Sequence, residues 1–326
     1  MAIACTLLRA ALATADRLVA PRLSILILHR VVPELDPLFP HEMHAARFDA
    51  LLTQLKSTFQ VLTLGDAHAL WSRQALPARA LAITFDDGYA DNAEVALPIL
   101  QKHGLRATFF VSTGFLDGGR MWNDTVIETL RACSLPQVDL SALGLGLRPL
   151  ASNADRRAGI DAVLPLIKYK PLQAREPALA ALLQACAEPA LPDNLMMRSD
   201  QVQLLHAAGM EIGAHTVRHP ILTATPDDAA LAEISVGRAQ LQRLTGAPVD
   251  VFAYPNGRPS RDYDRRHVEM VRQAGFRCAV STAAGTADAG CDPLQWPRFT
   301  PWDASDTAWL MRLTATRYAR GTAMRV

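Results

Sequence analysis

Two short segments of the chain hold the residues best suited to chemistry. The segment Ala82–Gly88 places two adjacent carboxylates, Asp86 and Asp87, at the end of an apolar run. The segment His215–His219 places two imidazoles four residues apart, again directly after a strand-like run. Two histidines and one aspartate are a common ligand set for a catalytic divalent metal, because they leave coordination positions open for water and substrate. The second carboxylate of the pair is then free to act as a base on that water.

Composition sets limits on the kind of protein that carries these residues. Half of the 326 residues are hydrophobic and a fifth are charged, so the chain can bury a sizeable core in one large domain or two modest ones. With 33 basic and 32 acidic side chains, nothing indicates a nucleic-acid partner. The five cysteines are dispersed without a close pair, which argues against a disulfide framework and favours a reducing, cytoplasmic compartment.

The N-terminal segment, residues 1–22, is apolar at helical spacing, but Arg9, Asp16 and Arg17 interrupt the run that a secretory signal requires. We predict an amphipathic helix there. It could pack on the domain, or it could lie on a membrane surface and place the protein peripherally at the inner membrane. No stretch approaches the length of a transmembrane span.

A repeated local pattern indicates the fold class. Helix-like segments end in a glycine, and an apolar run rich in β-forming residues follows at once, as at Gly104, Gly209 and Gly246. Runs that are apolar on both faces are typical of parallel strands covered by helices, so we predict an α/β protein with a parallel sheet. Strands are expected at 23–29, 61–64, 80–85, 107–111, 210–214, 249–253, 278–280 and 296–299, and helices at 45–58, 92–103, 200–208, 226–245 and 263–274.

Between residues 131 and 194 this rhythm stops, and Ala/Leu-rich helical pieces with several prolines replace it. We interpret 131–194 as a mostly helical insertion into one catalytic domain, which comprises 23–130 and 195–302. Residues 303–326 are expected to form a C-terminal helix. In a parallel α/β fold, binding groups collect at the carboxyl ends of the strands, and the candidate residues follow predicted strands.

The two motifs resemble the first two motifs of the polysaccharide deacetylases with a NodB homology domain, also called carbohydrate esterase family 4. That resemblance implies a distorted (β/α) barrel, a divalent metal that is usually zinc, and removal of N- or O-acetyl groups from sugars. Carried over, Asp86 resembles the catalytic base, and Asp87, His215 and His219 resemble the metal ligands. The same ligand set suits iron, cobalt, nickel and manganese, so zinc is implied by the resemblance alone.

The segment Phe252–Gly257 resembles the third motif of this family. The resemblance implies that the backbone N–H of Asn256 helps to hold the oxyanion, and Tyr254, Pro255 and Asn256 are candidates for contacting substrate. Packing within the loop is the alternative for Tyr254. Ala253 stands where the family usually has an arginine that partners the base. Arg298, at the end of the last predicted strand, is our candidate replacement; a surface salt bridge is its alternative.

Three further residues have candidate roles. His29 ends an apolar strand near the N-terminus, an arrangement that resembles circularly permuted, exopolysaccharide-type members whose general-acid histidine lies at the front of the domain. It would protonate the leaving amine; the alternative is an ordinary histidine at a strand end. Trp122 and Asp124 could supply a sugar-stacking ring and a polar contact, or simply a helix start with an anchoring tryptophan.

Together these features predict a metal-dependent hydrolase that removes N-acetyl groups from a sugar, a polysaccharide or a lipid-linked precursor, in the synthesis of a bacterial cell-surface glycan. One alternative keeps the metal and changes the acyl group, as in a deformylase or another amide hydrolase of the same superfamily. The other is a non-catalytic carbohydrate-binding protein that has kept the fold.

Overall fold

A computed structural model describes residues 21–300, 306–318 and 325–326. The predicted amphipathic helix over 1–22 therefore lies almost wholly outside the described residues, as do parts of the predicted C-terminal segment 303–326. Within the described ranges, no helix combines the length and the apolar character needed to cross a membrane.

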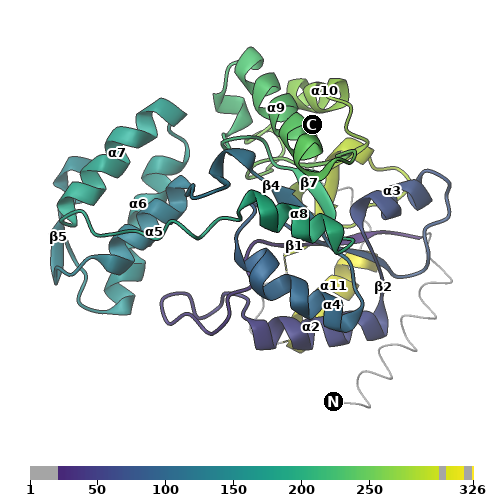
Figure 1. Cartoon of the computed structure of the whole chain (residues 1–326), viewed down its shortest axis with the longest axis horizontal. Helices are drawn as coiled ribbons and strands as arrows, with labels where there is room; N and C mark the ends of the chain where they lie inside the picture. The colour runs from purple at the N-terminus through teal and green to yellow at the C-terminus, as the bar shows by residue number, and fades with distance from the viewer. Residues whose placement is uncertain (1–20, 301–305, 319–324) are drawn as a thin grey trace.

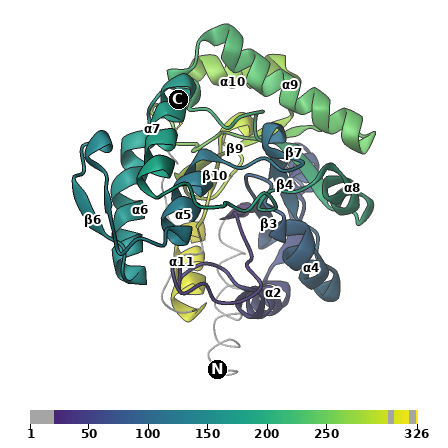
Figure 2. The ribbon, with the colours of Figure 1, turned by 60° about the vertical axis from the view of Figure 1, so that its left-hand side comes forward.

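The core of the fold is a parallel sheet that curls into a barrel (Figure 2). Its order is β1-β3-β4-β7-β8-β9-β10, and β2 pairs with the first half of β3. A parallel bridge between Leu26 and Phe299 brings the last strand beside the first. The predicted distorted (β/α) barrel is confirmed. The strands are β1 (Ser24–Leu28), β2 (Gln60–Leu62), β3 (Ala80–Phe85), β4 (Thr108–Val111), β7 (Glu211–Ala214), β8 (Val251–Ala253), β9 (Cys278–Ala284) and β10 (Trp296–Arg298).

Helices surround this sheet (Figure 1). They are α2 (Ala45–Thr58), α3 (Leu64–Trp71), α4 (Leu97–His103), α8 (Ser199–Ala207), α9 (Asp227–Thr245), α10 (Arg265–Gln273) and α11 (Asp306–Tyr318). Helices α4 and α9 end where Gly104 and Gly246 take the left-handed conformation, at φ of 63° and 67°. The helix expected over 92–103 begins with a π-helical turn, Asn92–Ala96. Helix α3 was not anticipated, because only the strand before it has a clear apolar pattern.

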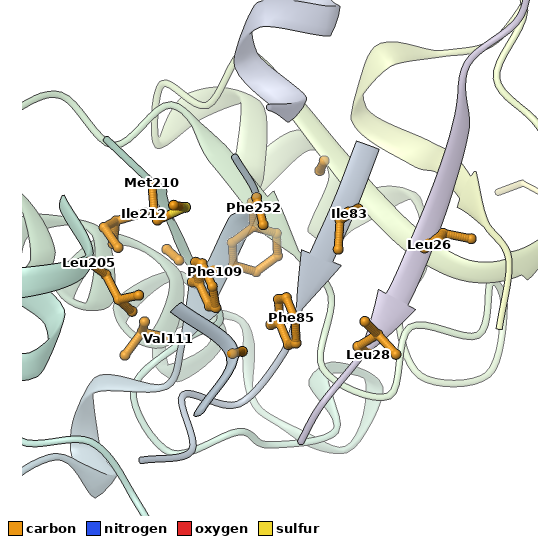
Figure 3. Close-up of a cluster of buried hydrophobic side chains, with 14 of the residues drawn as sticks. Leu26, Leu28, Ile83, Phe85, Phe109, Val111, Leu205, Met210, Ile212 and Phe252 are labelled. Atoms are coloured by element: carbon orange, nitrogen blue, oxygen red, sulfur yellow. The ribbon is translucent and has the colours of Figure 1, made fainter. Parts of the chain in front are cut away.

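Alternate residues of each strand face opposite sides of the sheet. One set packs outward against the helices, as Figure 3 shows for Ile83, Phe85 and Phe252. The other set fills the barrel interior, where Ala82 and Ala253 lie in one cluster with larger side chains such as Phe110 and Trp296. In the same phase as Ala82 come Thr84 and then Asp86, so the alternation directs the Asp86 carboxylate toward the interior.

The insertion forms a lobe beside the barrel (Figure 1). It contains α5 (Trp122–Ala132), β5 (Gln137–Asp139), β6 (Leu147–Pro149), α6 (Asn153–Lys168) and α7 (Leu172–Ala185). The lobe has its own apolar cluster, which includes Val126, Leu130, Ile160, Val163 and Leu182. Because the apolar side of α5 belongs to this cluster, the lobe starts before residue 131. The short antiparallel hairpin β5–β6 was also not anticipated.

Candidate active site

The carboxyl ends of β3 and β7 bring Asp87, His215 and His219 together. One ligand atom from each lies within 4.8 Å of the others. Nε2 of His215 and Nε2 of His219 are each 3.4 Å from Oδ1 of Asp87. The exposed fractions of Asp87 and His215 are 6% and 1%, so the cluster is almost fully enclosed.

These three residues fit a divalent metal. Oδ1 of Asp87 is buried and has no hydrogen-bond partner among the described residues, and 3.4 Å is too long for a hydrogen bond to either imidazole. Ligands at about 2.1 Å from one ion and at tetrahedral angles stand about 3.4 Å apart. The spacing is thus that of ligands around a cation rather than of a hydrogen-bonded pair. His215 Nδ1 lies 2.7 Å from the Ala253 carbonyl oxygen, which orients Nε2 toward Asp87.

The histidine segment is held by α9. A carboxylate oxygen of the buried Glu233 accepts hydrogen bonds from the backbone N–H groups of Val217 and Arg218, at 2.9 and 2.7 Å. Helix α9 approaches closely because Gly237 faces the turn: a Cβ there would lie 3.0 Å from the Thr216 carbonyl oxygen. Asp87 and His219 have φ of 76° and 51°, in the left-handed region that aspartate and histidine tolerate better than most residues. Glu233 has no sequence signal that would have linked it to the site.

Asp86 is paired with Arg298 inside the barrel. Nη1 and Nη2 of Arg298 donate to Oδ1 and Oδ2 of Asp86, both at 2.7 Å. Nε of Arg298 donates to the Ser281 carbonyl oxygen, and both residues of the pair are 2% exposed. The small Ala253 lies in the same interior layer. The guanidinium beside Asp86 therefore comes from β10 and not from β8, and Arg298 is not a surface residue.

The pKa values of Asp86, Asp87 and His219 are shifted by their surroundings. Burial alone would raise the pKa of Asp86, but Arg298, together with His215 and His29, more than offsets it, so the pKa lies below its usual range and the carboxylate is ionised. The pKa of Asp87 is also lowered, since the imidazoles outweigh the effect of burial. Burial lowers the pKa of His219 to about 3, which keeps its imidazole neutral, as metal binding requires.

The third motif supplies a backbone donor. Asn256 lines the same cavity as Asp87, at a φ of 58°, and its N–H meets no acceptor within the described ranges. The prediction that Tyr254 contacts substrate is wrong. Its side chain is 0% exposed, stacks on Tyr263 and donates to the Leu294 carbonyl oxygen at 3.0 Å. Pro255 is buried and does not line the cavity either.

His29 follows β1 and lines the cavity beside Asp86 and Asp87. Its backbone is anchored, because Nδ2 of Asn92 donates to the His29 carbonyl oxygen at 2.9 Å. No hydrogen bond to another described residue occupies the imidazole. The ring is therefore free to meet a substrate.

The cavity has a volume of about 610 Å³, within the range of about 300–1,000 Å³ typical of ligand sites, and residues of both the barrel and the lobe line it. The barrel supplies the polar groups already described. The lobe supplies Trp122, Asp124, Ile127, Leu164 and Lys168. Part of the Trp122 ring is covered by the Arg175 guanidinium, 5.1 Å from the ring centre. The insertion thus builds one wall of the site.

Asp124 is an unusual carboxylate. It is 4% exposed, its Oδ1 accepts a hydrogen bond from the Tyr89 hydroxyl at 3.1 Å, and its Oδ2 has no partner among the described residues. Burial raises its pKa to about 7. Tyr89 directly follows the Asp-Asp-Gly segment, a proximity that sequence reasoning did not use.

We expect Asp124→Asn to stabilise the metal-free protein above pH 7. Because the folded-state pKa of Asp124, about 7, exceeds the unfolded value of about 3.9, its contribution to stability is lost as pH rises between these values. The free energy of unfolding at pH 8 should rise by about 1–4 kcal/mol in the variant, and the gain should vanish near pH 4. Urea unfolding with a chelator present would measure this.

Asp193→Asn provides the control, because Asp193 is exposed, and a change there should stay within about 0.5 kcal/mol. A difference between wild type and Asp124→Asn that did not change with pH would contradict the assignment of a raised pKa.

Comparison with known proteins identifies the family. The sequence model named "Polysaccharide deacetylase" matches residues 73–135 and 162–279, more than half of the chain. The chain belongs to the polysaccharide deacetylase family. The matched ranges contain both aspartates, both histidines and Asn256, whereas His29 and Arg298 lie outside them. A curated relative, "Putative polysaccharide deacetylase YxkH" of Bacillus subtilis, is 41% identical over 54 residues, which are 16% of this chain and 19% of that protein.

Solved structures share the fold. The deacetylase PplD of Streptococcus pyogenes, in complex with acetate, has a TM-score of 0.60 and 19% identity, with 90% of this chain and 99% of that chain covered. IcaB from Ammonifex degensii has a TM-score of 0.58 and 19% identity, covering 91% and 97%. A de-N-acetylase from Aggregatibacter actinomycetemcomitans has a TM-score of 0.59 and 16% identity, covering 90% and 99%. These likenesses show that the fold of this chain is known from solved structures.

Proposed function

We propose that this protein is a metal-dependent deacetylase that removes N-acetyl groups from a sugar, a polysaccharide or a lipid-linked precursor used in cell-surface glycan synthesis. One observation carries the proposal: an Asp-His-His set with cation-like spacing lies beside an ionised aspartate at the floor of one cavity. Neither a pure binding protein nor a turn-forming Asp-Asp-Gly segment needs a buried carboxylate oxygen without a partner.

Each residue would have a separate task. Asp87, His215 and His219 would hold the metal, with zinc the first candidate. A divalent cation there lowers the pKa of water and polarises a carbonyl oxygen. Asp86, kept ionised by Arg298, accepts the proton of the attacking water. The Asn256 N–H donates to the oxygen of the acetyl group as negative charge develops on it.

The remaining candidates act on the rest of the substrate. His29 donates a proton to the departing nitrogen, without which an amide does not cleave at neutral pH. Trp122 and Asp124 contact the sugar, the first by ring stacking and the second through its free Oδ2. Support for these roles is that all three side chains line the cavity.

The direct test is a matched panel of one oligosaccharide carrying N-acetyl, O-acetyl or N-formyl groups at the same position. Released acid and free amine are measured for each. Preferred release of acetate with appearance of an amine supports the proposal. Preferred release of formate would assign the deformylase alternative, and binding without any release would assign the non-catalytic alternative.

A further inference from the structure

Two cations line the cavity, one from the lobe and one from the barrel. Lys168 is the last residue of α6, in the lobe, and Arg258 lies in the loop after β8, in the barrel. Both line the cavity that holds Asp86 and His219. They therefore meet whatever enters between the lobe and the barrel.

These two cations differ from the other arginines that line the cavity, each of which has a carboxylate partner: Arg30 with Asp91 at 2.7 Å, and Arg131 with Asp36 at 2.7 Å. Lys168 and Arg258 form no ion pair with a carboxylate in the described ranges. Neither charge is therefore paired through a direct contact.

The surroundings of Lys168 are crowded with positive charge. Burial lowers the pKa of Lys168, and Asp262 opposes that shift. Neighbouring guanidinium groups lower it further: Arg258, Arg261 and Arg175. The buried carboxylate of Asp262 stands against these cations: its Oδ2 accepts a hydrogen bond from the Arg258 backbone N–H at 3.0 Å, and its Oδ1 has no partner among the described residues. An anion placed here would relieve repulsion between cations.

A structural role at the helix end does not account for Lys168. A cation at the C-terminus of a helix is favourable, but Arg175 already serves there. Nη2 of Arg175 donates to the Lys168 carbonyl oxygen at 2.8 Å, and its Nε donates to the Lys170 carbonyl oxygen at 3.1 Å. Nζ of Lys168 lies 5.8 Å from the centre of the Tyr169 ring and forms no hydrogen bond or ion pair with a described residue, so it can still bind an anion in the cavity.

The pair lies close to the proposed reaction centre. Arg258 follows Asn256 by two residues, so their Cα atoms are at most about 7 Å apart. A group bound by Arg258 therefore belongs to the sugar that carries the acetyl group or to its immediate neighbour. Arg258 can bind a phosphate or a carboxylate with two parallel hydrogen bonds, and Lys168 adds a point charge.

We propose that Lys168 and Arg258 form an anion-binding subsite. This inference rests on the deacetylase function proposed above, and it makes the substrate an N-acetylated sugar that bears, or lies next to, a phosphate or a carboxylate. Phosphate would indicate a carrier-linked sugar phosphate, and carboxylate would indicate a uronic acid in an acidic glycan. The shared chemistry is one anionic group within a sugar unit of the acetyl group.

Three matched substrates test the subsite: a neutral N-acetylated oligosaccharide, the same oligosaccharide with a neighbouring uronic acid, and an N-acetylated sugar 1-phosphate. We expect kcat/KM for at least one anionic substrate to exceed that of the neutral one by about tenfold or more at low salt. Added NaCl should reduce this preference and leave the neutral substrate unaffected.

Variants locate the effect. Lys168→Gln and Arg258→Gln should each lower kcat/KM for the preferred anionic substrate about five- to tenfold, and change it less than about twofold for the neutral one. Lys170→Gln and Arg243→Gln remove equal charge from exposed positions outside the cavity and should change neither. A purely structural role would affect all substrates alike.

The outcomes separate the two proposals. Preference for the phosphate or for the uronic acid identifies the source of the anion. Equal use of all three substrates, with no effect of either variant, overturns the subsite and leaves the deacetylase intact. If no substrate loses acetate, calorimetric titration with the uronic-acid oligosaccharide and with the sugar 1-phosphate decides. Weaker binding of either compound to the Lys168→Gln/Arg258→Gln double variant than to wild type supports the subsite, and equal binding of both overturns it.

Discussion

Replacing Asp86 with asparagine should reduce kcat for deacetylation by about 10²–10⁴-fold, because the variant cannot accept the proton of the attacking water. The same change leaves the buried Arg298 guanidinium without its anion, so we also expect the free energy of unfolding to fall by about 3–5 kcal/mol. Steady-state acetate release and urea unfolding would measure the two effects separately.

Two comparisons show whether this loss is chemical. Asp86→Asn should still bind one divalent ion, since Asp86 is not a proposed ligand, whereas Asp87→Asn should lose both metal binding and activity. Asp250→Asn, which removes a carboxylate paired with Arg238 at the other end of β8, should retain kcat within about twofold because surface ion pairs contribute little. Wild-type activity in Asp86→Asn would exclude it as the base.

The second large effect is expected at Arg298. Without the guanidinium, only His215 and His29 oppose the effect of burial, so we expect the pKa of Asp86 to rise and part of the protein to carry a protonated Asp86 at pH values where wild type is active. Arg298→Gln should therefore lower kcat at pH 7 by at least about 10²-fold, and the acidic limb of the pH–rate profile should move to higher pH. Arg298→Lys, which keeps the charge but not the paired hydrogen bonds, should lose less.

A pH profile separates this role from a structural one, because simple loss of packing lowers activity at every pH. The double variant Arg298→Gln/Ala253→Arg adds a positive control, since it returns an arginine to the position where the family usually has one. An unshifted acidic limb in Arg298→Gln would contradict the proposed control of Asp86 by Arg298.

The barrel could be predicted from the sequence because each of its helix–strand units has a recognisable local sequence pattern. A helix ending in glycine, followed by a strand apolar on both faces, marks one turn of the barrel wherever it occurs. The lobe has no such signal, because its strands have only three residues each. Helix α5 belongs to the lobe because it packs against α6 and α7, which are distant from it in sequence.

Some residues of the candidate site could also be predicted from local sequence patterns, and others could not. Asp86, Asp87, His215 and His219 were found because each motif is contiguous. The prediction that Tyr254 contacts substrate was wrong, and the alternation of side chains along the strand could have corrected it. Ala253 faces the barrel interior, so Tyr254, the next residue, faces the helices. Arg298 meets Asp86 only because β10 returns to the side of β1. Lys168 and Arg258 line one cavity only because the lobe folds beside the barrel. No local pattern encodes either approach.

Metal reconstitution tests the central claim most directly. The protein is stripped with a chelator, and acetate release from an N-acetylated substrate is followed as zinc is added. We expect activity to fall by at least about 10³-fold on stripping, to return with added zinc, and to reach its maximum at one ion per chain, with no recovery in His219→Ala. Full activity in the stripped protein, or full recovery in His219→Ala, would contradict the assignment of Asp87, His215 and His219 as the metal site of a deacetylase.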